Sequence, residues 1–423
     1  MLKTAIRKVG SITIGGEYYI ERELAYGANN YHPLPVVLCK GEGMFLWDTS
    51  GKCYYDFLAA YSAVNQGHCH PKIVEAMASQ AKTLSITSRA FYNNLLGETE
   101  ELLCKTFSFD KCLMMNSGVE AGESAIKIAR RWGYEVKGIP QGQAEIVFCS
   151  NNFWGRTIAA CGSSDDPDRY KNFGPFAGLN FKIIPYDNVE ALEQAISGTN
   201  IAGFMFEPIQ GEAGVVIPTH GYYEKVRKLC TKHKVLMIAD EIQTGIGRTG
   251  KMLCLDWENV KPDIVTLAKS LSGGLMPISA VLGKKEVMDV LVPGSHGSTF
   301  GGNPMACRVA QAALGVIKDE KLVENSEKMG EIFRKQMSKL IGGYIKEVRG
   351  RGLMNAVVIK NKKGAWDLCL KLAENGLLAK PTHGNIIRFT PPLIINEEQL
   401  NECIQIIRKT VVELHKFNPK DND

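Results

Sequence analysis

The sequence contains no uninterrupted apolar run of about 18 residues, so no segment is long and apolar enough to predict a transmembrane helix. Long basic runs are also missing, and the net charge of +5 is spread over 50 basic and 45 acidic residues. Such dilute charge is unlike a nucleic-acid-binding surface. Internal repeats and low-complexity segments are lacking as well. We therefore predict a globular protein with no membrane span and no nucleic-acid partner.

The C-x-x-C pattern is absent, although the chain has 12 cysteines. Many lie in apolar runs, such as Cys149 and Cys254, which is typical of reduced core thiols in an intracellular protein. Cys149 and Cys161 flank a loop expected near the active site, so a regulatory disulfide between them is left open. The His-Cys-His sequence at 68–70 could suggest a metal, but adjacent residues rarely converge on one ion. We predict a turn before a helix there, and no metal site.

The first 16 residues (MLKTAIRKVGSITIGG) are basic, hydroxylated and free of acids. This composition fits a short mitochondrial presequence, and it also fits a plain N-terminal tail. Because the segment is short for a presequence, we predict a cytoplasmic protein, with the mitochondrial matrix as the alternative.

The fold class predicted from the pattern is α/β. From Lys111 onward, short apolar runs alternate with helical patterns, which favours a mainly parallel sheet covered by helices on both faces. The expected strands are 112–116, 145–149, 181–185, 202–206, 235–239, 263–268 and 278–282. The expected helices between them include 119–136, 189–197 and 221–233.

The two ends of the chain carry other patterns. MFLWDTSGKCYYDFL at 44–58 predicts a hairpin that turns at Ser50-Gly51, and residues 71–83 and 93–107 favour helices. After Asn303 the pattern predicts, in order, a helical stretch 304–341, strand 345–359, helix 364–375, strand 386–389 and helix 396–415. Because 423 residues favour more than one domain, we expect four regions. They are a tail (1–16), a segment that contributes to the small domain (17–75), a large α/β domain (76–324) and a small α+β domain (325–423).

The strongest chemical signal lies between residues 235 and 274. A buried strand ends on the acidic pair that begins with Asp240, and a second apolar run, 263–268, delivers Lys269 before a Ser/Gly loop. Ligands of α/β sheets lie beyond the carboxyl ends of strands. A lysine and an acid at that edge indicate pyridoxal 5'-phosphate (PLP), which needs a lysine for its Schiff base and an acid to keep its pyridinium protonated. An ordinary salt bridge is the alternative reading of an isolated Lys/Asp pair.

Two segments are suited to frame such a cofactor. Residues 116–123 (NSGVEAGE) follow a strand and open a helix, whose N-terminal N–H groups favour a phosphate. A plain helix start is the alternative. Phe153 and Trp154 offer aromatic faces for a pyridine ring, and Arg156 offers a fork for a substrate carboxylate. In isolation, these three residues also suit core aromatics and a surface charge.

Further polar groups follow other strands. Glu207 and Glu212 close the strand at 202–206, where a solvated strand end is the alternative reading. Arg388 lies in an apolar strand, where an unpaired charge would be costly, so it needs a carboxylate from the protein or from a ligand. Residues 297–303 (GSTFGGN) form a second glycine-rich loop before a helix, with hydroxyls suited to phosphate, although many such loops are only turns.

Together these segments resemble the class III, fold-type I PLP-dependent aminotransferases. The motifs IADEIQTGIGRTG, TLAKSLSGG, NSGVEAGE, EPIQGEAG and STFGGNP carry the resemblance, which runs in order from Tyr26 to Leu414. Within that family the chain is most similar to the ornithine δ-aminotransferases, in the segments NYHPLP (30–35), YSAVNQGHCHP (61–71), TSRAFYNN (87–94), NFWGRT (152–157) and LLAKPTHG (377–384). The N-terminal 16 residues lie outside the resemblance.

The resemblance implies a role for each matching residue. Lys269 would form the Schiff base and move the proton, Asp240 would hold the pyridinium, and Gln243 the ring hydroxyl. Phe153 would stack on the ring. The phosphate would be held by Gly118, Val119, Ser298 and Thr299, the last two from the partner subunit. The substrate would contact Tyr31, Tyr61, Trp154, Arg156, Glu207, Glu212 and Arg388. The resemblance also implies an obligate homodimer with its active sites at the interface.

The implied reaction transfers the δ-amino group of L-ornithine to 2-oxoglutarate. N-acetylornithine and 4-aminobutyrate are alternative substrates, because each also presents a distal amine and a carboxylate. A glutamate-semialdehyde aminomutase would need no 2-oxoglutarate, and a Schiff-base aldolase or decarboxylase would need Lys269 without a phosphate cradle. A non-catalytic relative should have lost Lys269 or Asp240, and both are present.

Overall fold

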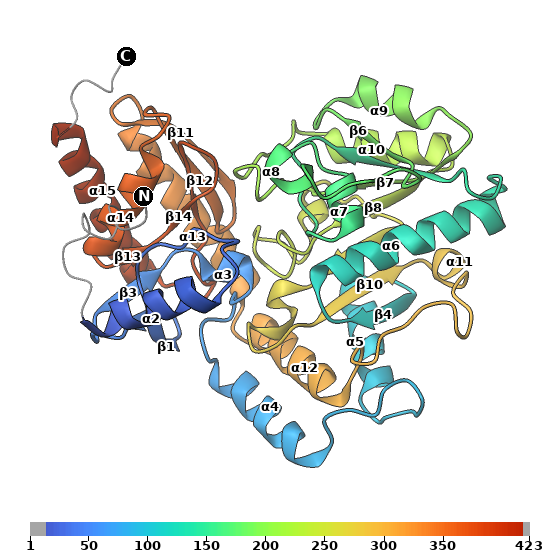
Figure 1. Ribbon diagram of the computed structural model, residues 1–423, viewed down its shortest axis with the longest axis horizontal. Helices are drawn as coiled ribbons and strands as arrows, with labels where there is room; N and C mark the ends of the chain where they lie inside the picture. The colour runs from blue at the N-terminus through green and yellow to red at the C-terminus, as the bar shows by residue number, and fades with distance from the viewer. Residues whose placement is uncertain (1–13, 418–423) are drawn as a thin grey trace.

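The computed structural model describes residues 14–417, and its centre is a seven-stranded sheet in the order β4-β10-β9-β8-β7-β5-β6 (Figure 1). The strands are β4 (Lys111–Met115), β5 (Glu145–Cys149), β6 (Phe181–Ile184), β7 (Ile201–Phe206), β8 (Leu236–Asp240), β9 (Ile264–Leu267) and β10 (Ser279–Gly283). Neighbours pair in parallel except around β10, which runs antiparallel to both β9 and β4. The α/β fold class with a mainly parallel sheet is therefore confirmed.

Helices cover both faces of this sheet, which is why its central strands are mainly apolar rather than alternating. Every residue of β7 is buried. Its Met205 packs in one apolar cluster with α6 (Gly118–Trp132), while Phe204 and Phe206 pack in another with α10 (Tyr222–Lys232). Next to α10 lies α9 (Val189–Ile196). The helix predicted at 119–136 is α6 followed by a π-helical turn, Gly133–Lys137.

The C-terminal part forms a second, antiparallel sheet in the order β11-β12-β15-β14. Its strands are β11 (Ile345–Arg351), β12 (Met354–Ile359), β14 (Lys380–Pro381) and β15 (Ile386–Phe389), and its helices are α13 (Leu322–Met337), α14 (Ala365–Glu374) and α15 (Glu397–Phe417). These elements, orange to red in Figure 1, stand beside the large sheet domain.

The N-terminal segment joins this C-terminal part. The predicted hairpin forms from β2 (Phe45–Asp48) and β3 (Cys53–Asp56), and β1 (Leu38–Glu42) pairs with β2. The parallel strand β13 (Leu377–Leu378) completes the sheet from the far end of the chain. The helices α4 (Pro71–Thr83) and α5 (Leu96–Phe107) then lead into β4, close to the predicted bounds.

Three predicted elements differ from those observed. The stretch 304–341 forms two main helices, α12 (Pro304–Asp319) and α13, because Lys321 takes a left-handed φ of 52° between them. The stretch 345–359 is the hairpin β11–β12, which turns at Gly352 with a φ of 51°. A helix, α2 (Ile14–Tyr26), starts before the predicted end of the tail at residue 16, and residues 1–13 of that tail lie outside the described residues.

No helix within the described stretch, residues 14–417, combines the length and the apolar character that crossing a bilayer requires.

Arg248 fastens the large domain to the other two parts. Its side chain is fully buried, and burial lowers the pKa of its guanidinium to about 9, so it remains a cation at neutral pH. Nη1 donates to the carbonyl oxygens of Leu353 (3.1 Å) and Pro391 (2.6 Å), and Nη2 donates to Oδ1 of Asn65 (2.5 Å). One buried fork therefore bonds the β11–β12 turn, the segment after β15 and the N-terminal segment.

Replacing Arg248 with Ala should lower the free energy of unfolding by about 2–5 kcal/mol, because it leaves buried acceptors without a donor. Arg308→Ala, at an exposed site on α12, is the matched control and should change that free energy by no more than about 0.5 kcal/mol. Urea unfolding followed by tryptophan fluorescence measures both. Equal losses in the two variants would contradict the junction role of Arg248.

Candidate active site

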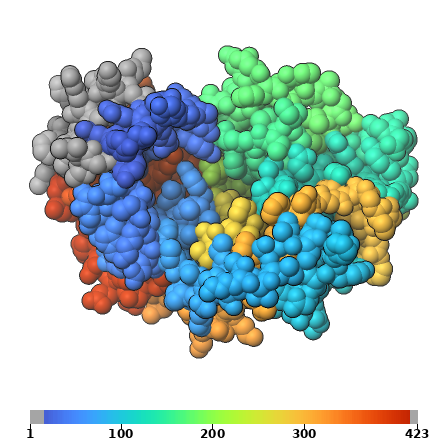
Figure 2. All heavy atoms as spheres, turned by 60° about the horizontal axis from the view of Figure 1, so that its bottom comes forward, coloured from blue at the N-terminus to red at the C-terminus, as the bar shows by residue number. Residues whose placement is uncertain are grey.

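A cavity of about 550 Å³ opens at the carboxyl ends of the large sheet's strands. It brings together residues from β8, β9, the loop after β5, the loop after β7 and the start of α6. In Figure 2 yellow atoms from the middle of the colour scale show between the blue N-terminal segment and the green part of the large domain. The predicted residues that line the cavity are Gly118, Val119, Phe153, Trp154, Glu207, Glu212, Asp240, Gln243 and Lys269.

Lys269 follows β9 in a strained conformation. Its φ of 42° is left-handed, a region that costs a non-glycine residue on the order of 1–2 kcal/mol. Burial lowers the pKa of its ammonium group, and the carboxylates of Asp240, Glu212 and Glu207 only partly offset this effect. A lowered pKa leaves more of the amine neutral, which is the nucleophilic form.

Asp240 ends β8 beside this lysine. Its side chain is 4% exposed, and Oδ1 accepts hydrogen bonds from the backbone N–H of Ile242 (3.1 Å) and from Oγ1 of Thr266 (3.2 Å). Burial raises its pKa to about 6, although these hydrogen bonds and Lys269 act in the opposite direction. The group is therefore ionised at neutral pH, and a buried anion on a cavity wall is suited to a cationic ring nitrogen.

The start of α6 forms the anion-binding end of the cavity. Oε2 of Glu120 accepts the backbone N–H groups of Asn116 (3.1 Å) and Ser117 (2.6 Å) in a capping box. The next two N–H groups, of Gly118 and Val119, have no hydrogen-bond acceptor within the described part of the chain. Free N–H groups at the N-terminus of a 15-residue helix are suited to a phosphate. Together with the amine and the buried acid, this donor set fits PLP.

Ser298 and Thr299 do not line the cavity in this single chain. Oγ of Ser298 accepts a hydrogen bond from Nδ2 of Asn116 (2.9 Å), so the loop before α12 lies near the N-terminus of α6. Thr299 is exposed.

The segment after β5 carries residues with three different environments. Phe153 lines the cavity, and its N–H donates to Oε1 of Glu207 (2.9 Å). Trp154 is 5% exposed and also packs in the core, since its Nε1 donates to Oγ of Ser163 and its ring stacks on Phe148. Arg156 is exposed and is not among the lining residues; its guanidinium carbon is 5.8 Å from the centre of the Phe153 ring.

Arg388 receives its carboxylate from the protein. On β15 it is 3% exposed, with Nη1 donating to Oε1 of Glu212 (2.9 Å) and Nη2 to Oε2 (3.3 Å). Burial would raise the pKa of Glu212, but the charge and hydrogen bonds of Arg388, with Lys269 and Arg169, hold it below its usual value. This ion pair joins a loop of the large domain to a strand of the small one.

Glu207 has both carboxylate oxygens occupied. Oε1 accepts from Phe153, and Oε2 accepts the N–H of Gly211 (3.1 Å). Burial and the neighbouring charge of Asp240 raise its pKa to about 8. Its bonds therefore orient the backbone of Phe153, a role that the sequence prediction of a substrate contact did not include.

The two predicted tyrosines lie in different places. Tyr61 belongs to α3 (Ala59–Ser62), in which all four residues have left-handed φ values. The guanidinium carbon of Arg388 is 5.0 Å from the ring centre of Tyr61. The carbonyl oxygen of Tyr61 accepts a hydrogen bond from Nε2 of Gln243 (3.4 Å). Tyr31 is 65% exposed and lines a separate cavity of about 500 Å³ beside α2 and Trp366. The structure does not bring Tyr31 to the main cavity.

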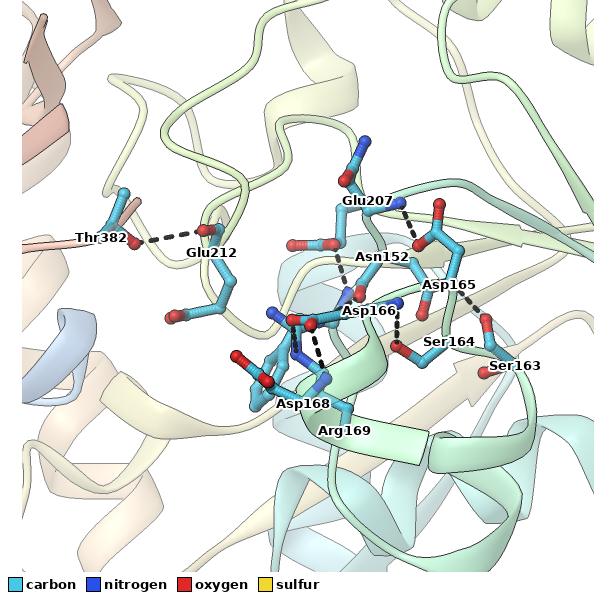
Figure 3. A network of polar contacts seen from close by, with 12 residues as sticks. Asn152, Ser163, Ser164, Asp165, Asp166, Asp168, Arg169, Glu207, Glu212 and Thr382 are labelled. Atoms are coloured by element: carbon cyan, nitrogen blue, oxygen red, sulfur yellow. Dashed lines mark hydrogen bonds and ion pairs between the residues drawn. The ribbon is translucent and has the colours of Figure 1, made fainter. Parts of the chain in front are cut away.

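Sequence reasoning missed Thr266 and Arg169. Thr266 bonds Asp240 from an apolar strand, where its hydroxyl gave no signal. Arg169, in the short helix α8 (Pro167–Tyr170), reaches the segment after β5 (Figure 3). Its only local signal is the helix start at Asp166-Pro167 three residues before the cation.

The chain matches the family Aminotransferase class-III over residues 26–411. It is 60% identical over 398 residues to a mitochondrial ornithine aminotransferase from Drosophila melanogaster. The aligned residues cover 94% of this chain and 92% of that protein. A crystal structure of the ornithine aminotransferase from Toxoplasma gondii, described with partial occupancy of PLP at its active site, is similar with a TM-score of 0.94, 47% identity and 99% of each chain covered. An acetylornithine aminotransferase from Elizabethkingia anophelis has a TM-score of 0.86 and 55% identity, over 94% of this chain and 99% of that one.

The raised pKa of Glu207 makes stability depend on pH. Its folded pKa of about 8 lies above the ordinary value of 4.5, so between those values the folded protein binds more protons than the unfolded one. This group therefore makes the free energy of unfolding fall as pH rises from about 5 to about 8. Glu207→Gln should reduce that fall by about 1 kcal/mol or more.

Urea unfolding of the cofactor-free protein measures this effect. The pH values of about 5, 6.5 and 8 lie between the ordinary pKa of a glutamate and the folded pKa of Glu207. Glu98→Gln, at an exposed site on α5, is the control and should retain the pH dependence of the original chain. A Glu207→Gln variant with an unchanged pH dependence would refute the shifted pKa.

Proposed function

Because this chain belongs to the class-III aminotransferase family, whose members depend on PLP, we propose that it transfers the δ-amino group of L-ornithine to 2-oxoglutarate. The products are glutamate 5-semialdehyde and glutamate. The main structural support is the ion pair between Arg388 and Glu212, because Glu212 lines the same cavity as Lys269. The names of the Drosophila and Toxoplasma relatives support the same substrate.

PLP, when bound, supplies an aldehyde that reacts with amines and a protonated ring that stabilises negative charge at the carbon losing its proton. Lys269 would provide the amine that bonds this aldehyde, and once the substrate amine has displaced it, its free Nζ would take up the substrate proton and return it. Asp240, ionised above pH 6, holds the proton on the ring nitrogen. We assign the ring hydroxyl to Gln243 and the outer face of the ring to Phe153, which also excludes water.

The phosphate contacts include a proposed partner. The N–H groups of Gly118 and Val119 contribute from this chain, while Ser298 and Thr299 would reach the phosphate of a second copy across a homodimer interface. Exposed apolar side chains support such an interface, because Phe91 is 73% exposed, Tyr92 95% and Phe300 58%. Large apolar side chains exposed at the surface commonly mark protein–protein contacts where they gather in a patch.

Two substrates of different charge must use one cavity. Ornithine reacts at its far end, so only one carboxylate needs a cation, and we assign that role to Arg156, with Tyr31 as a predicted further contact. For 2-oxoglutarate both carboxylates need cations. Glu212 neutralises Arg388 while ornithine is bound and releases it to the second acid. Nε of Arg388 is buried and has no hydrogen-bond partner among residues 14–417, which leaves a donor available to a substrate.

Tyr61 and Trp154 complete the proposed substrate site. Tyr61 contacts the Arg388 guanidinium and would fill the space next to the distal amine. Trp154 gives the cavity a rigid wall, because its ring is fixed by Ser163 and Phe148. For the compartment we propose the cytoplasm, with the mitochondrial matrix as the alternative that the name of the Drosophila relative favours.

A second substrate, N-acetylornithine, is favoured by the 55% identity to the acetylornithine aminotransferase from Elizabethkingia anophelis. Product analysis with ornithine, N-acetylornithine and 4-aminobutyrate, each supplied with 2-oxoglutarate, separates the candidates. We expect ornithine to give the highest kcat/KM, glutamate 5-semialdehyde to form, and Lys269→Ala to abolish turnover. A higher kcat/KM with N-acetylornithine would replace the proposed substrate, and turnover without 2-oxoglutarate would indicate an aminomutase.

Replacing Glu212 with Ala should shift the preference toward ordinary α-amino acids, because it leaves Arg388 open to α-carboxylates. We expect the kcat/KM for glutamate relative to ornithine to rise by roughly tenfold or more, as the loss of one charged competitor implies. Glu190→Ala, at an exposed acid on α9, is the control. Unchanged selectivity in Glu212→Ala would show that Arg388 is not gated by this carboxylate.

A further inference from the structure

The side chain of Arg169 runs from the surface helix α8 toward the cavity segment after β5 (Figure 3). It is 10% exposed, and its Nε pairs with Oδ2 of Asp166 at 3.0 Å. The other oxygen of Asp166 accepts the N–H of Asp168 (3.0 Å) and caps α8. The carboxylate that holds the arginine is therefore itself fixed by the backbone.

One peptide unit, between Asn152 and Phe153, is held at both of its polar atoms. Nη1 of Arg169 donates to the carbonyl oxygen of Asn152 at 2.7 Å. The N–H of Phe153 donates to Oε1 of Glu207 at 2.9 Å. Because the plane of a peptide unit sets the directions of the bonds that leave it, these two contacts fix where the Phe153 side chain begins.

Arg169 also contacts the aromatic ring itself. Its guanidinium carbon is 4.8 Å from the ring centre of Phe153, nearer than the 5.8 Å of Arg156. A guanidinium at this distance is attracted to the ring quadrupole, more strongly where water is excluded. The same side chain thus holds both the backbone and the ring of Phe153.

The surrounding contacts make this arrangement rigid. Nδ2 of Asn152 donates to the carbonyl oxygens of Cys149 (2.8 Å) and Ser163 (2.7 Å), and the N–H of Asn151 donates to Oδ1 of Asp165 (2.8 Å). These bonds hold the segment after β5 without Arg169. What Arg169 adds is the orientation of one peptide and one ring, so its loss should leave the fold intact.

We propose that Arg169 is a positioning residue of the reaction, which holds the Phe153 ring against the ring of PLP by bonding the Asn152 carbonyl and covering the aromatic face. This inference rests on the role proposed above for Phe153. It does not depend on ornithine as the substrate, because its consequence is the affinity and orientation of the cofactor.

The test is titration of cofactor-free protein with PLP, followed by tryptophan fluorescence, visible absorbance and circular dichroism of the bound cofactor. Arg169→Met should raise the dissociation constant roughly tenfold and weaken the cofactor dichroism per bound molecule. Arg169→Lys keeps the positive charge but loses the guanidinium, so its dissociation constant for PLP should lie between those of the original chain and Arg169→Met. The control is Lys171→Met, an exposed cation two positions along, which should bind PLP as the original chain does.

A double-mutant cycle identifies the route of the effect. If Arg169 acts through Phe153, Arg169→Met should change the dissociation constant by less than about twofold in a Phe153→Leu background. The melting temperature of the cofactor-free variants separates positioning of Phe153 from a purely structural role of Arg169. A purely structural role would lower that temperature and leave the dichroism per bound cofactor unchanged. Equal affinity and dichroism in Arg169→Met and Lys171→Met, or additive effects in the cycle, would overturn the proposal. A different preferred amino donor in product analysis would affect the proposed substrate and leave this inference standing.

Discussion

Three carboxylates and one amine line a single cavity at the edge of the large sheet, and removing such charges from water is expensive. Each group meets that cost differently. Asp240 receives two hydrogen bonds and the nearby ammonium, Glu212 receives a two-pronged guanidinium, and Glu207 binds two backbone N–H groups while its pKa rises. The lowered pKa of Lys269 is the remaining adjustment. The reactivity of the amine therefore follows from the same desolvation that constrains the acids.

The fold supplies this space through the ends of its strands and through strained turns. Parallel strands bring Asp240 and Lys269 to one edge although 29 positions separate their numbers in the sequence. Left-handed backbone occurs at Lys269 and through all of α3, which carries Tyr61. Asp56 supports that turn, since its Oδ1 accepts the N–H groups of Leu58 and Ala59. The strained backbone at Lys269 therefore lies where its side chain faces the cavity.

Much of this arrangement was predictable because buried parallel strands are continuous apolar runs, and their ends mark the site. The strands before Asp240 and Lys269 were located in this way within a residue or so. The break at Lys321 was not predictable, because no proline or glycine marks it. Gly352 did offer a turn signal within the strand predicted at 345–359.

The limits of the site prediction have a different origin. Arg169 contacts Phe153 through a tertiary approach of two loops, which no spacing in the sequence encodes. Tyr31 was assigned by resemblance alone, and Ser298 and Thr299 also by the hydroxyls of their glycine-rich loop, but the single chain does not bring these residues to the cavity. Their proposed roles would require a second copy of the chain or a closer approach of the N-terminal segment.

The Arg388–Glu212 contact is also a tie between the two halves of the molecule, because one partner lies on β15 and the other on the loop after β7. A second tie lies beside it, where Thr382 donates to the carbonyl oxygen of Glu212 at 3.1 Å. A small acid that bound the Arg388 guanidinium in place of Glu212 would remove one of these two contacts. If the proposed release of Arg388 occurs, the contact between β15 and the loop after β7 depends on which acid occupies the cavity.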